Sequence, residues 1–236
     1  IDHIPARQAV DILIQATSGL HYRVWDRDMT VFPSSISFDA LGVSDEENMQ
    51  TVIAVGRHAA GLGIPLSFEV EPGIEAEPTK PEEAVALLQA IDREVPGIVD
   101  LFAPAVGTLH GQTTVGANTT FNAPLLGEVQ DALQQALGRP IGMALHGSSG
   151  LSDEQLAAGV AQGVVKINTA TMLYGVRARA AREYFNTHAD EIQAGHKNMK
   201  EASKDTTVDT AVSASLSPVI AARMRVSNAA GHGKAA

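Results

Sequence analysis

Short apolar runs alternate along the chain with longer segments whose apolar residues recur at helical spacing. The short runs predict strands at Ser35–Phe38, Pro65–Val70, Ile98–Val106, Ile141–Leu145 and Gly163–Ile167, with a possible sixth strand ending at Ile1. The longer segments predict helices at 44–62, 79–93, 125–137, 171–188 and 218–226, and a further one opening at Ser152. Strands separated by single helices imply parallel neighbours, because a parallel pair needs a crossover connection.

Three predicted helices begin with capping-box patterns, at Ser44–Glu47, Thr79–Glu82 and Ser152–Gln155. The polar stretch Gly195–Asp209 is expected to be a loop or frayed helix, and Gly231–Ala236 a mobile tail. Because no interdomain linker is evident, we expect residues 1–236 to form a single domain.

This α/β pattern fits either an open doubly wound sheet or most of a TIM (β/α)8 barrel. Polar residues follow nearly every predicted strand: Asp39, Glu69, Glu71, His110, His146 and Asn168. A closed barrel brings the ends of that many strands to one centre, so this arrangement favours the barrel.

Composition narrows the function. The 236 residues are 44% hydrophobic and carry a net charge of −10, which argues against binding to nucleic acid or to an anionic membrane surface. No stretch reaches the roughly 18–20 apolar residues of a spanning helix, and the first residues do not resemble a signal peptide, so a cytoplasmic location is expected. With no cysteine, any zinc site must use the eight histidines and carboxylates.

Two histidines end predicted strands, and each is followed by glycine: His110–Gly111 and His146–Gly147. Neutral imidazole is a good zinc ligand, and glycine lets the backbone approach a bound group. A hydrogen-bonded histidine at a strand end is the alternative for each. The segments Gly147–Gly150 and Lys166–Thr171 both lead towards helices and could hold a phosphate, although such loops are also ordinary turns.

Glu69 and Glu71 are two residues apart and therefore share one side of their strand. In a barrel lumen they would need a cation or hydrogen-bond donors to stay charged. The alternative is an acidic pair that faces solvent.

The ordered set of motifs resembles the class II, zinc-dependent ketose-bisphosphate aldolases, over about Ser35 to Thr171. The matching segments are Phe38–Asp39, Glu46–Asn48, Ser67–Gly73, Ala103–Gly111, Leu145–Gly150 and Gly163–Thr171. The resemblance implies a TIM barrel, usually dimeric or tetrameric, that uses Zn²⁺ and possibly a monovalent cation. It implies reversible cleavage of a ketose bisphosphate, with fructose 1,6-bisphosphate favoured, to dihydroxyacetone phosphate and the aldehyde glyceraldehyde 3-phosphate.

The resemblance also implies roles for individual residues. His3, His110 and His146 would be zinc ligands, with His21 a disfavoured replacement for His3. Asp2 would be the acid/base for the aldehyde-derived hydroxyl, and Glu71 an acid near the metal. Asn168 would share the developing oxyanion charge. The phosphate and the substrate oxygens would be held by Gly111, Gly147, Ser149, Asn168, Ala170 and Thr171.

The sequence departs from the family pattern in several places. If Asp2–His3 ends the third strand, the first two strand–helix units are missing from this sequence. Tyr22–Asp28 is an apparent insertion, Ser148 replaces a glycine, and Phe38–Leu41 replaces an Asp-Gly-Ser motif. The segment Ile74–Pro78 replaces a glycine-rich loop that supplies a base, so a non-catalytic barrel that binds a sugar phosphate or a partner is the alternative function.

Two other chemistries are disfavoured. A Schiff-base aldolase would use Lys166 as nucleophile, but strand alternation places this lysine on the side of Asn168, where the resemblance gives it no such role. A metal-dependent hydrolase is disfavoured because no strand carries a His-x-His pair.

Overall fold

The computed structural model describes residues 4–39, 43–63, 66–72, 77–111, 116, 118–193, 202 and 204–229. These residues divide into two compact units, made of 1–107, 120–146 and 161–167, and of 108–119, 147–160 and 168–236. None of the described helices is long and apolar enough to cross a membrane. The prediction of one barrel domain over the whole chain stays a prediction.

The first unit is built on a six-stranded sheet in which all neighbouring strands are parallel. Its order is β1 (Ile4–Pro5), β4 (Ser35–Asp39), β5 (Ser67–Val70), β6 (Val99–Phe102), β7 (Gly142–Leu145) and β8 (Val164–Ile167). From β4 to β8 the spatial order follows the sequence order, as successive βαβ units require. The α/β class and the parallel sheet are confirmed, and the described strands do not show a closed barrel.

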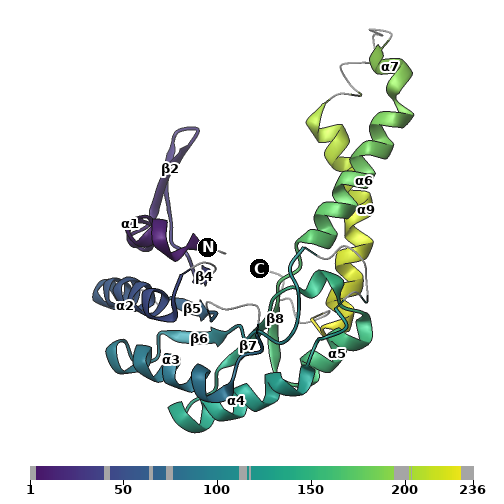
Figure 1. Ribbon diagram of the computed structural model, residues 1–236. Helices are drawn as coiled ribbons and strands as arrows, with labels where there is room; N and C mark the ends of the chain where they lie inside the picture. Colours follow the sequence, from purple (N-terminus) through teal and green to yellow (C-terminus); the bar gives the residue numbers. More distant parts are fainter. Residues whose placement is uncertain are drawn as a thin grey trace. The chain divides into compact units, whose positions relative to one another are not determined.

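Helices cover the outer face of this sheet, as Figure 1 shows. They are α1 (Ala6–Thr17), α2 (Asp45–Leu62), α3 (Pro81–Glu94) and α4 (Ala123–Leu137), and each packs against the next along the chain. The apolar runs supply the core: Phe38, Phe68 and Phe102 lie on adjacent strands and are fully buried. The rings of Phe38 and Phe68 meet edge to face, with centroids 4.9 Å apart.

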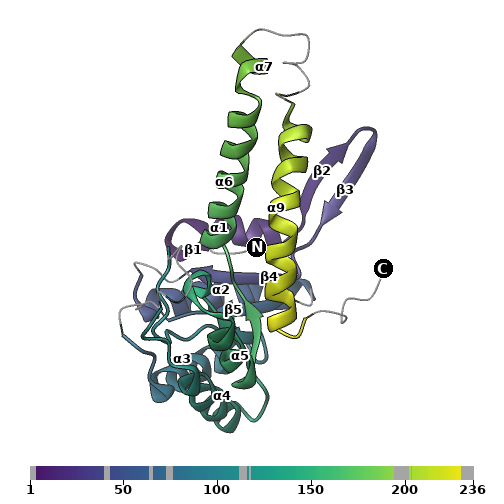
Figure 2. The same cartoon turned by 90° about the vertical axis from the view of Figure 1, so that its right-hand side faces the viewer.

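The second unit is largely helical. It contains η1 (Ser148–Gly150), α5 (Asp153–Ala161), which begins there, α6 (Thr171–Thr187), α7 (Ala189–Gln193) and α9 (Asp205–Val226). Figures 1 and 2 both show α6 and α9 side by side along most of their length. The Tyr184 hydroxyl at the far end of α6 donates to the Ala202 carbonyl (2.8 Å).

The apolar runs locate the strands well, but the predicted start of the last helix is wrong. The sequence predicts this helix over 218–226, whereas Pro218 lies inside α9, which already begins at Asp205. Of the stretch Gly195–Asp209, predicted as a loop or frayed helix, residues 205–209 form the start of α9. Most of the rest of this stretch, and the tail Gly231–Ala236, lie outside the described residues.

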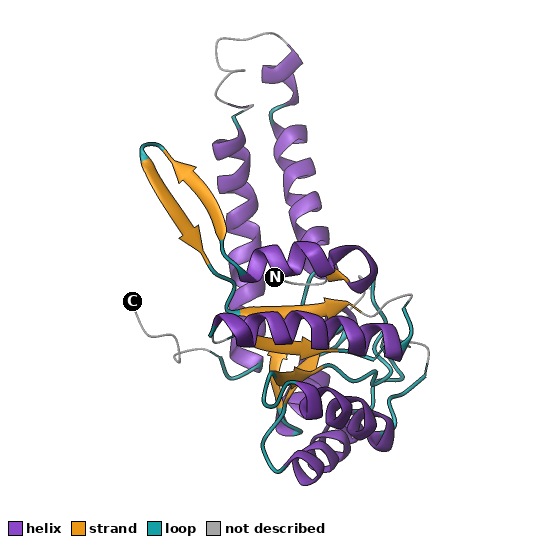
Figure 3. Ribbon diagram, turned by 90° about the vertical axis from the view of Figure 1, so that its left-hand side faces the viewer, coloured by secondary structure: helices purple, strands orange, loops and turns teal. Residues whose placement is uncertain are grey.

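Two of the three predicted capping boxes are present in the structure. Ser44 and Glu47 form the reciprocal capping box, as do Ser152 and Gln155. The third predicted box is wrong, since the cap of α3 is Lys80 and the Thr79 hydroxyl accepts from the Ala105 N–H instead (2.8 Å). The apparent insertion folds as an antiparallel hairpin, β2 (Leu20–Val24) and β3 (Arg27–Val31), which Figure 3 shows extending from α1.

Candidate active site

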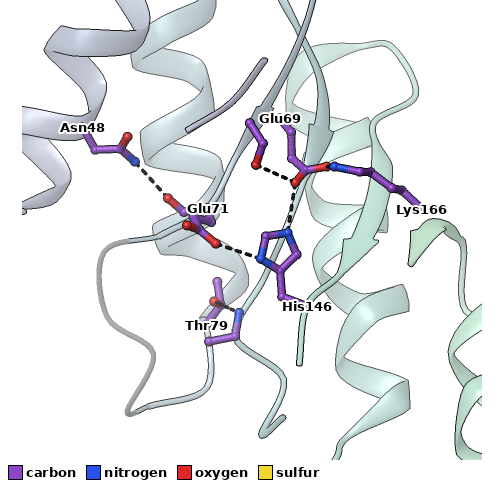
Figure 4. Close-up of polar contacts among 8 residues, drawn as sticks. Asn48, Glu69, Glu71, Thr79, His146 and Lys166 are labelled. Atoms are coloured by element: carbon purple, nitrogen blue, oxygen red, sulfur yellow. Dashed lines mark hydrogen bonds and ion pairs between the residues drawn. The ribbon is translucent and has the colours of Figure 1, made fainter. Parts of the chain in front are cut away.

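Four charged residues of the first unit meet where parallel strands end. Glu69 lies in β5 and Glu71 directly after it, His146 follows β7, and Lys166 lies in β8. Parallel strands present their carboxyl ends at one edge, which is where α/β proteins place ligands. Figure 4 shows Glu69 and Glu71 at the His146 ring, and Lys166 at the Glu69 carboxylate.

The imidazole of His146 lies between two carboxylates. Its Nε2 is 2.9 Å from Glu69 Oε1 and its Nδ1 is 3.0 Å from Glu71 Oε2. Lys166 Nζ donates to the other oxygen of Glu69 (2.8 Å), and the Ser37 hydroxyl donates to Oε1 (2.9 Å). Glu69 therefore receives hydrogen bonds at both of its oxygens.

Glu71 is held by a different kind of contact. Asn48, fully buried in α2, donates its side-chain N–H to the Glu71 backbone carbonyl (2.9 Å). This bond fixes the main chain just beyond β5 and so aims the Glu71 side chain at His146, as Figure 4 shows. Sequence reasoning missed Asn48, which the family motif contains but whose partner lies in another element.

The charges of this cluster are set by burial and hydrogen bonding. Glu69 is 2% exposed, and although burial disfavours its charge, hydrogen bonds to His146 and Lys166 prevail and lower its pKa to about 2. Burial likewise opposes charge on His146, but its two carboxylate partners raise its pKa to about 9. In the metal-free protein at neutral pH, Glu69 is ionised and His146 is protonated.

This geometry decides between the two interpretations of the acidic pair. Glu69 and Glu71 are both buried and both point at His146, so the solvent-facing alternative is wrong. The hydrogen-bond donors that a buried carboxylate needs are supplied to Glu69 by His146, Lys166 and Ser37. The ion pair makes Lys166 a counter-ion of Glu69, which does not favour its use as a Schiff-base nucleophile.

In the second unit, two candidate phosphate-binding segments are tied together. The Ser148 hydroxyl donates to the Asn168 carbonyl (2.8 Å) and lies 2.6 Å from the Thr169 hydroxyl. The Met172 N–H donates to the Ser149 hydroxyl (3.1 Å), which joins η1 to the first turn of α6. Ser148, noted in the sequence as a departure from glycine, is therefore a structural link between these loops.

Gly147 opens the first of these segments in the left-handed conformation, with φ 64°. A β-carbon there would lie 3.0 Å from Thr108 Cβ, so the backbone approaches the segment after Gly107 closely. Asn118 holds the same contact, since its side chain donates to the Gly147 carbonyl (2.9 Å) and accepts from the Leu109 N–H (3.2 Å). Asn118 is 1% exposed and was not anticipated from the sequence.

The remaining predicted site residues do not lie together in one described cluster. His110 and Gly111 lie in an exposed turn of the second unit, whereas His146 belongs to the first. Asp2 and His3 lie outside the described residues. Asn168, Ala170 and Thr171 form the entry to α6, where Ala170 is the N-cap. His21 lies in the exposed hairpin, with its Nδ1 2.8 Å from the Thr30 hydroxyl.

His146, Glu69 and Glu71 carry the kinds of chemical group that bind zinc. Among the described residues no group of three or more histidines and carboxylates is arranged to hold a metal ion, and one of the three predicted ligands, His3, lies outside them. Imidazole and carboxylate are zinc ligands, and a zinc-binding histidine usually donates its other ring N–H to a carboxylate. His146 has a carboxylate at each nitrogen, so either nitrogen could be so paired.

Known proteins resemble this chain over most of its length. The family model described as fructose-bisphosphate aldolase class-II matches residues 1–232. A fructose-bisphosphate aldolase of Streptococcus pneumoniae is 30% identical over 204 residues, which are 83% of this chain and 65% of that protein. The chain thus spans less than two thirds of that relative's length. A fructose-bisphosphate aldolase of Candida albicans is 26% identical over 188 residues, or 72% of this chain and 52% of the relative.

Solved structures show the same fold. The fructose-bisphosphate aldolase of Campylobacter jejuni superposes with a TM-score of 0.74 at 19% identity, over 96% of this chain and 68% of that one. The YdjI aldolase of Escherichia coli K12 gives 0.61 at 21% identity, over 85% and 63%. These matches confirm the resemblance drawn from the motifs, and the chain belongs to the class-II fructose-bisphosphate aldolase family.

Proposed function

We propose that this protein is a zinc-dependent aldolase that reversibly cleaves a ketose bisphosphate, fructose 1,6-bisphosphate in the first instance, to dihydroxyacetone phosphate and glyceraldehyde 3-phosphate. The observation that carries the proposal is the buried His146, held at the carboxyl ends of the strands between Glu69 and Glu71. Family membership makes carbon–carbon cleavage the chemistry to expect of this site.

Three histidines would hold the metal in this proposal: His146, His110 and His3. Bound zinc supplies a Lewis acid that polarises the substrate carbonyl and offsets negative charge developing on its oxygen. Because His146 is protonated in the metal-free protein at neutral pH, zinc binding there would release a proton.

Glu69 sets which nitrogen of His146 is available. A neutral imidazole that donates from Nε2 to Glu69 has its lone pair on Nδ1. Glu69 can keep this role because Lys166 and Ser37 hold it in place and balance its charge. We assign Glu69 as a positioning residue and Glu71 as the acid that acts near the substrate.

The remaining site residues would bind and protonate substrate. Ser149, Ala170 and Thr171 would offer hydroxyl and backbone N–H donors to a phosphate, together with the backbone of Gly111 and Gly147. Asn168 would donate to the oxyanion as charge develops, and Asp2 would exchange a proton with the aldehyde-derived hydroxyl. A monovalent cation near the phosphate and a homodimer or homotetramer are further expectations from the family.

The direct test is an activity assay on the protein that carries this chain. With Zn²⁺ it should release triose phosphate from fructose or tagatose bisphosphate. Chelation with EDTA should abolish the activity, and added Zn²⁺ should restore it. A zinc-loaded protein that cleaves no phosphorylated ketose would overturn the proposal.

A second candidate is a non-catalytic protein that binds a sugar phosphate or a partner. It is favoured by the changed segment Ile74–Pro78, of which Glu77 and Pro78 are described; proline restricts the backbone where the family has glycine. Hydrogen exchange at dihydroxyacetone phosphate separates the two, because it requires a working base but no complete turnover. Tight phosphate binding without exchange would favour the second candidate.

A further inference from the structure

The inserted hairpin β2–β3 has one apolar and one polar face. Cross-strand partners lie on the same face of a sheet, and Leu20 pairs with Val31 and Tyr22 with Met29. Val24 continues this face at the tip end of β2, where its cross-strand partner is Arg27. The opposite face carries the pairs His21–Thr30 and Arg23–Asp28. The alternation is therefore that of a strand pair with one face built to be covered.

Within the part of the chain that the structure describes, the apolar face is open to solvent. Its residues are between 38% and 49% exposed: Leu20, Tyr22, Val24, Met29 and Val31. A two-stranded sheet without packing on one face is at best marginally stable in water. Neither strand has a second neighbour within the described residues, so both also present open edges.

The backbone at both ends of the hairpin adopts conformations with positive φ. At its base Gly19 has φ 101°, and a β-carbon there would lie 2.7 Å from a methyl carbon of Thr30. At its tip Trp25 is 93% exposed and has φ 55°, a conformation that a bulky residue rarely adopts. A strained, solvent-facing tryptophan costs free energy unless a partner covers it.

Charge indicates the kind of partner. The whole chain has a net charge of −10, so two copies repel each other over most of their surface. The hairpin is different, because Arg23 and Arg27 balance Asp26 and Asp28. A neutral segment with both signs of charge can meet a second copy of itself without net repulsion, which favours a two-fold interface at this position.

We propose that the hairpin Leu20–Val31 is a self-association surface that packs its apolar face against the same face of a second copy of this chain. The paired faces bury the side chains of both copies, and the arginines of one copy meet the aspartates of the other at the tips. The inference is independent of the proposed catalytic function, since His146 and its partners lie on other elements.

Two adjacent substitutions test it. Tyr22→Lys places a charge on the apolar face, and His21→Lys places the same charge on the polar face. Sedimentation equilibrium over about 1 μM to 1 mM should show dimers of the unaltered protein. Tyr22→Lys should weaken the dimer at least about tenfold, or about 1.4 kcal/mol, whereas His21→Lys should change it less than about twofold.

A spectroscopic measurement guards against misfolded variants. Because the chain has no cysteine, Ser34→Cys at the exposed base of the hairpin gives a unique site for a spin label. A defined distance between labels of two copies should be present in the His21→Lys background and lost with Tyr22→Lys. A monomer at every concentration, or a dimer that survives Tyr22→Lys, would overturn the proposal.

Discussion

His146 has a carboxylate on each side of its ring, and the two carboxylates are not equivalent. Glu69 is fixed by Ser37 and Lys166 in addition to His146, and Glu71 approaches the other ring nitrogen, Nδ1. A fully satisfied polar network is rigid, and a rigid second shell is what orients a metal-binding imidazole. Glu69 is therefore the residue whose charge should matter most for the ring.

Glu69→Gln should weaken zinc binding by about 10–100-fold, the usual cost of losing a carboxylate behind a ligand histidine. The amide keeps the shape of the side chain but removes the charge that pairs with His146 and Lys166. Zinc titration against a competing chelator measures the effect. Glu94→Gln is the matched control, because Glu94 pairs with Arg57 at the surface; equal affinities in both variants would show that Glu69 does not position the ligand.

Asp92→Asn should destabilise the protein by about 1 kcal/mol at neutral pH and much less in acid. Burial opposes its charge, but Arg139 and the Gly97 N–H outweigh burial and lower the Asp92 pKa. A carboxyl with a lowered pKa in the folded state contributes stability above its unfolded pKa, and this contribution is lost as the pH falls through the folded pKa.

Urea unfolding of both proteins at about pH 7 and at about pH 3 provides the measurement. Substitution of an exposed acid outside these contacts, Glu128→Gln, should give no comparable loss at either pH. A destabilisation by Asp92→Asn that is the same at both pH values would mean that shape rather than charge is responsible.

Residue chemistry could be anticipated from the sequence where it depends on local spacing. Period two places Glu69 and Glu71 on one side, and the structure confirms it. The partnership of Glu69 with Lys166, 97 residues further along, could not be anticipated in this way, because it depends on how strands β5 and β8 come together. The roles of Asp2, His3 and His110 stay predictions.

At the scale of elements, apolar runs placed β4 to β8 to within a few residues, because each strand must bury its side chains. The last helix begins earlier than predicted, because α9 accommodates Pro218 in its interior, where proline is normally unfavourable. The hairpin lies in an insertion relative to the family pattern, and Leu20, Tyr22 and Val24 alternate there with polar residues. An antiparallel sheet commonly buries its apolar face against the core, whereas the apolar face of this hairpin is exposed.

The loop after β7 depends on a glycine for two separate reasons. Gly147→Ala must adopt a positive φ and also place its β-carbon against Thr108, whereas Gly138→Ala, at φ 67°, meets only the first difficulty. We expect Gly138→Ala to cost about 1 kcal/mol and Gly147→Ala about 1–2 kcal/mol more. Denaturant unfolding of the two variants checks this order, and equal losses would show that the approach to Thr108 is not tight.

At the scale of the whole molecule, the proposed chemistry draws on residues of both compact units. His146, Glu69 and Glu71 belong to the first, whereas His110 and the candidate phosphate loops belong to the second. Local patterns cannot predict which residues of distant segments meet, since that depends on tertiary packing. The family match supports the proposed aldolase chemistry, because relatives of the same fold are aldolases by name.

The most direct measurement of the central claim is a crystal structure of the zinc-soaked protein, with an anomalous map at the zinc edge. The account predicts one zinc ion bound by the imidazoles of His146, His110 and His3, with Glu69 retained on His146. A map with zinc elsewhere, or with no ion within bonding distance of His146, would contradict it.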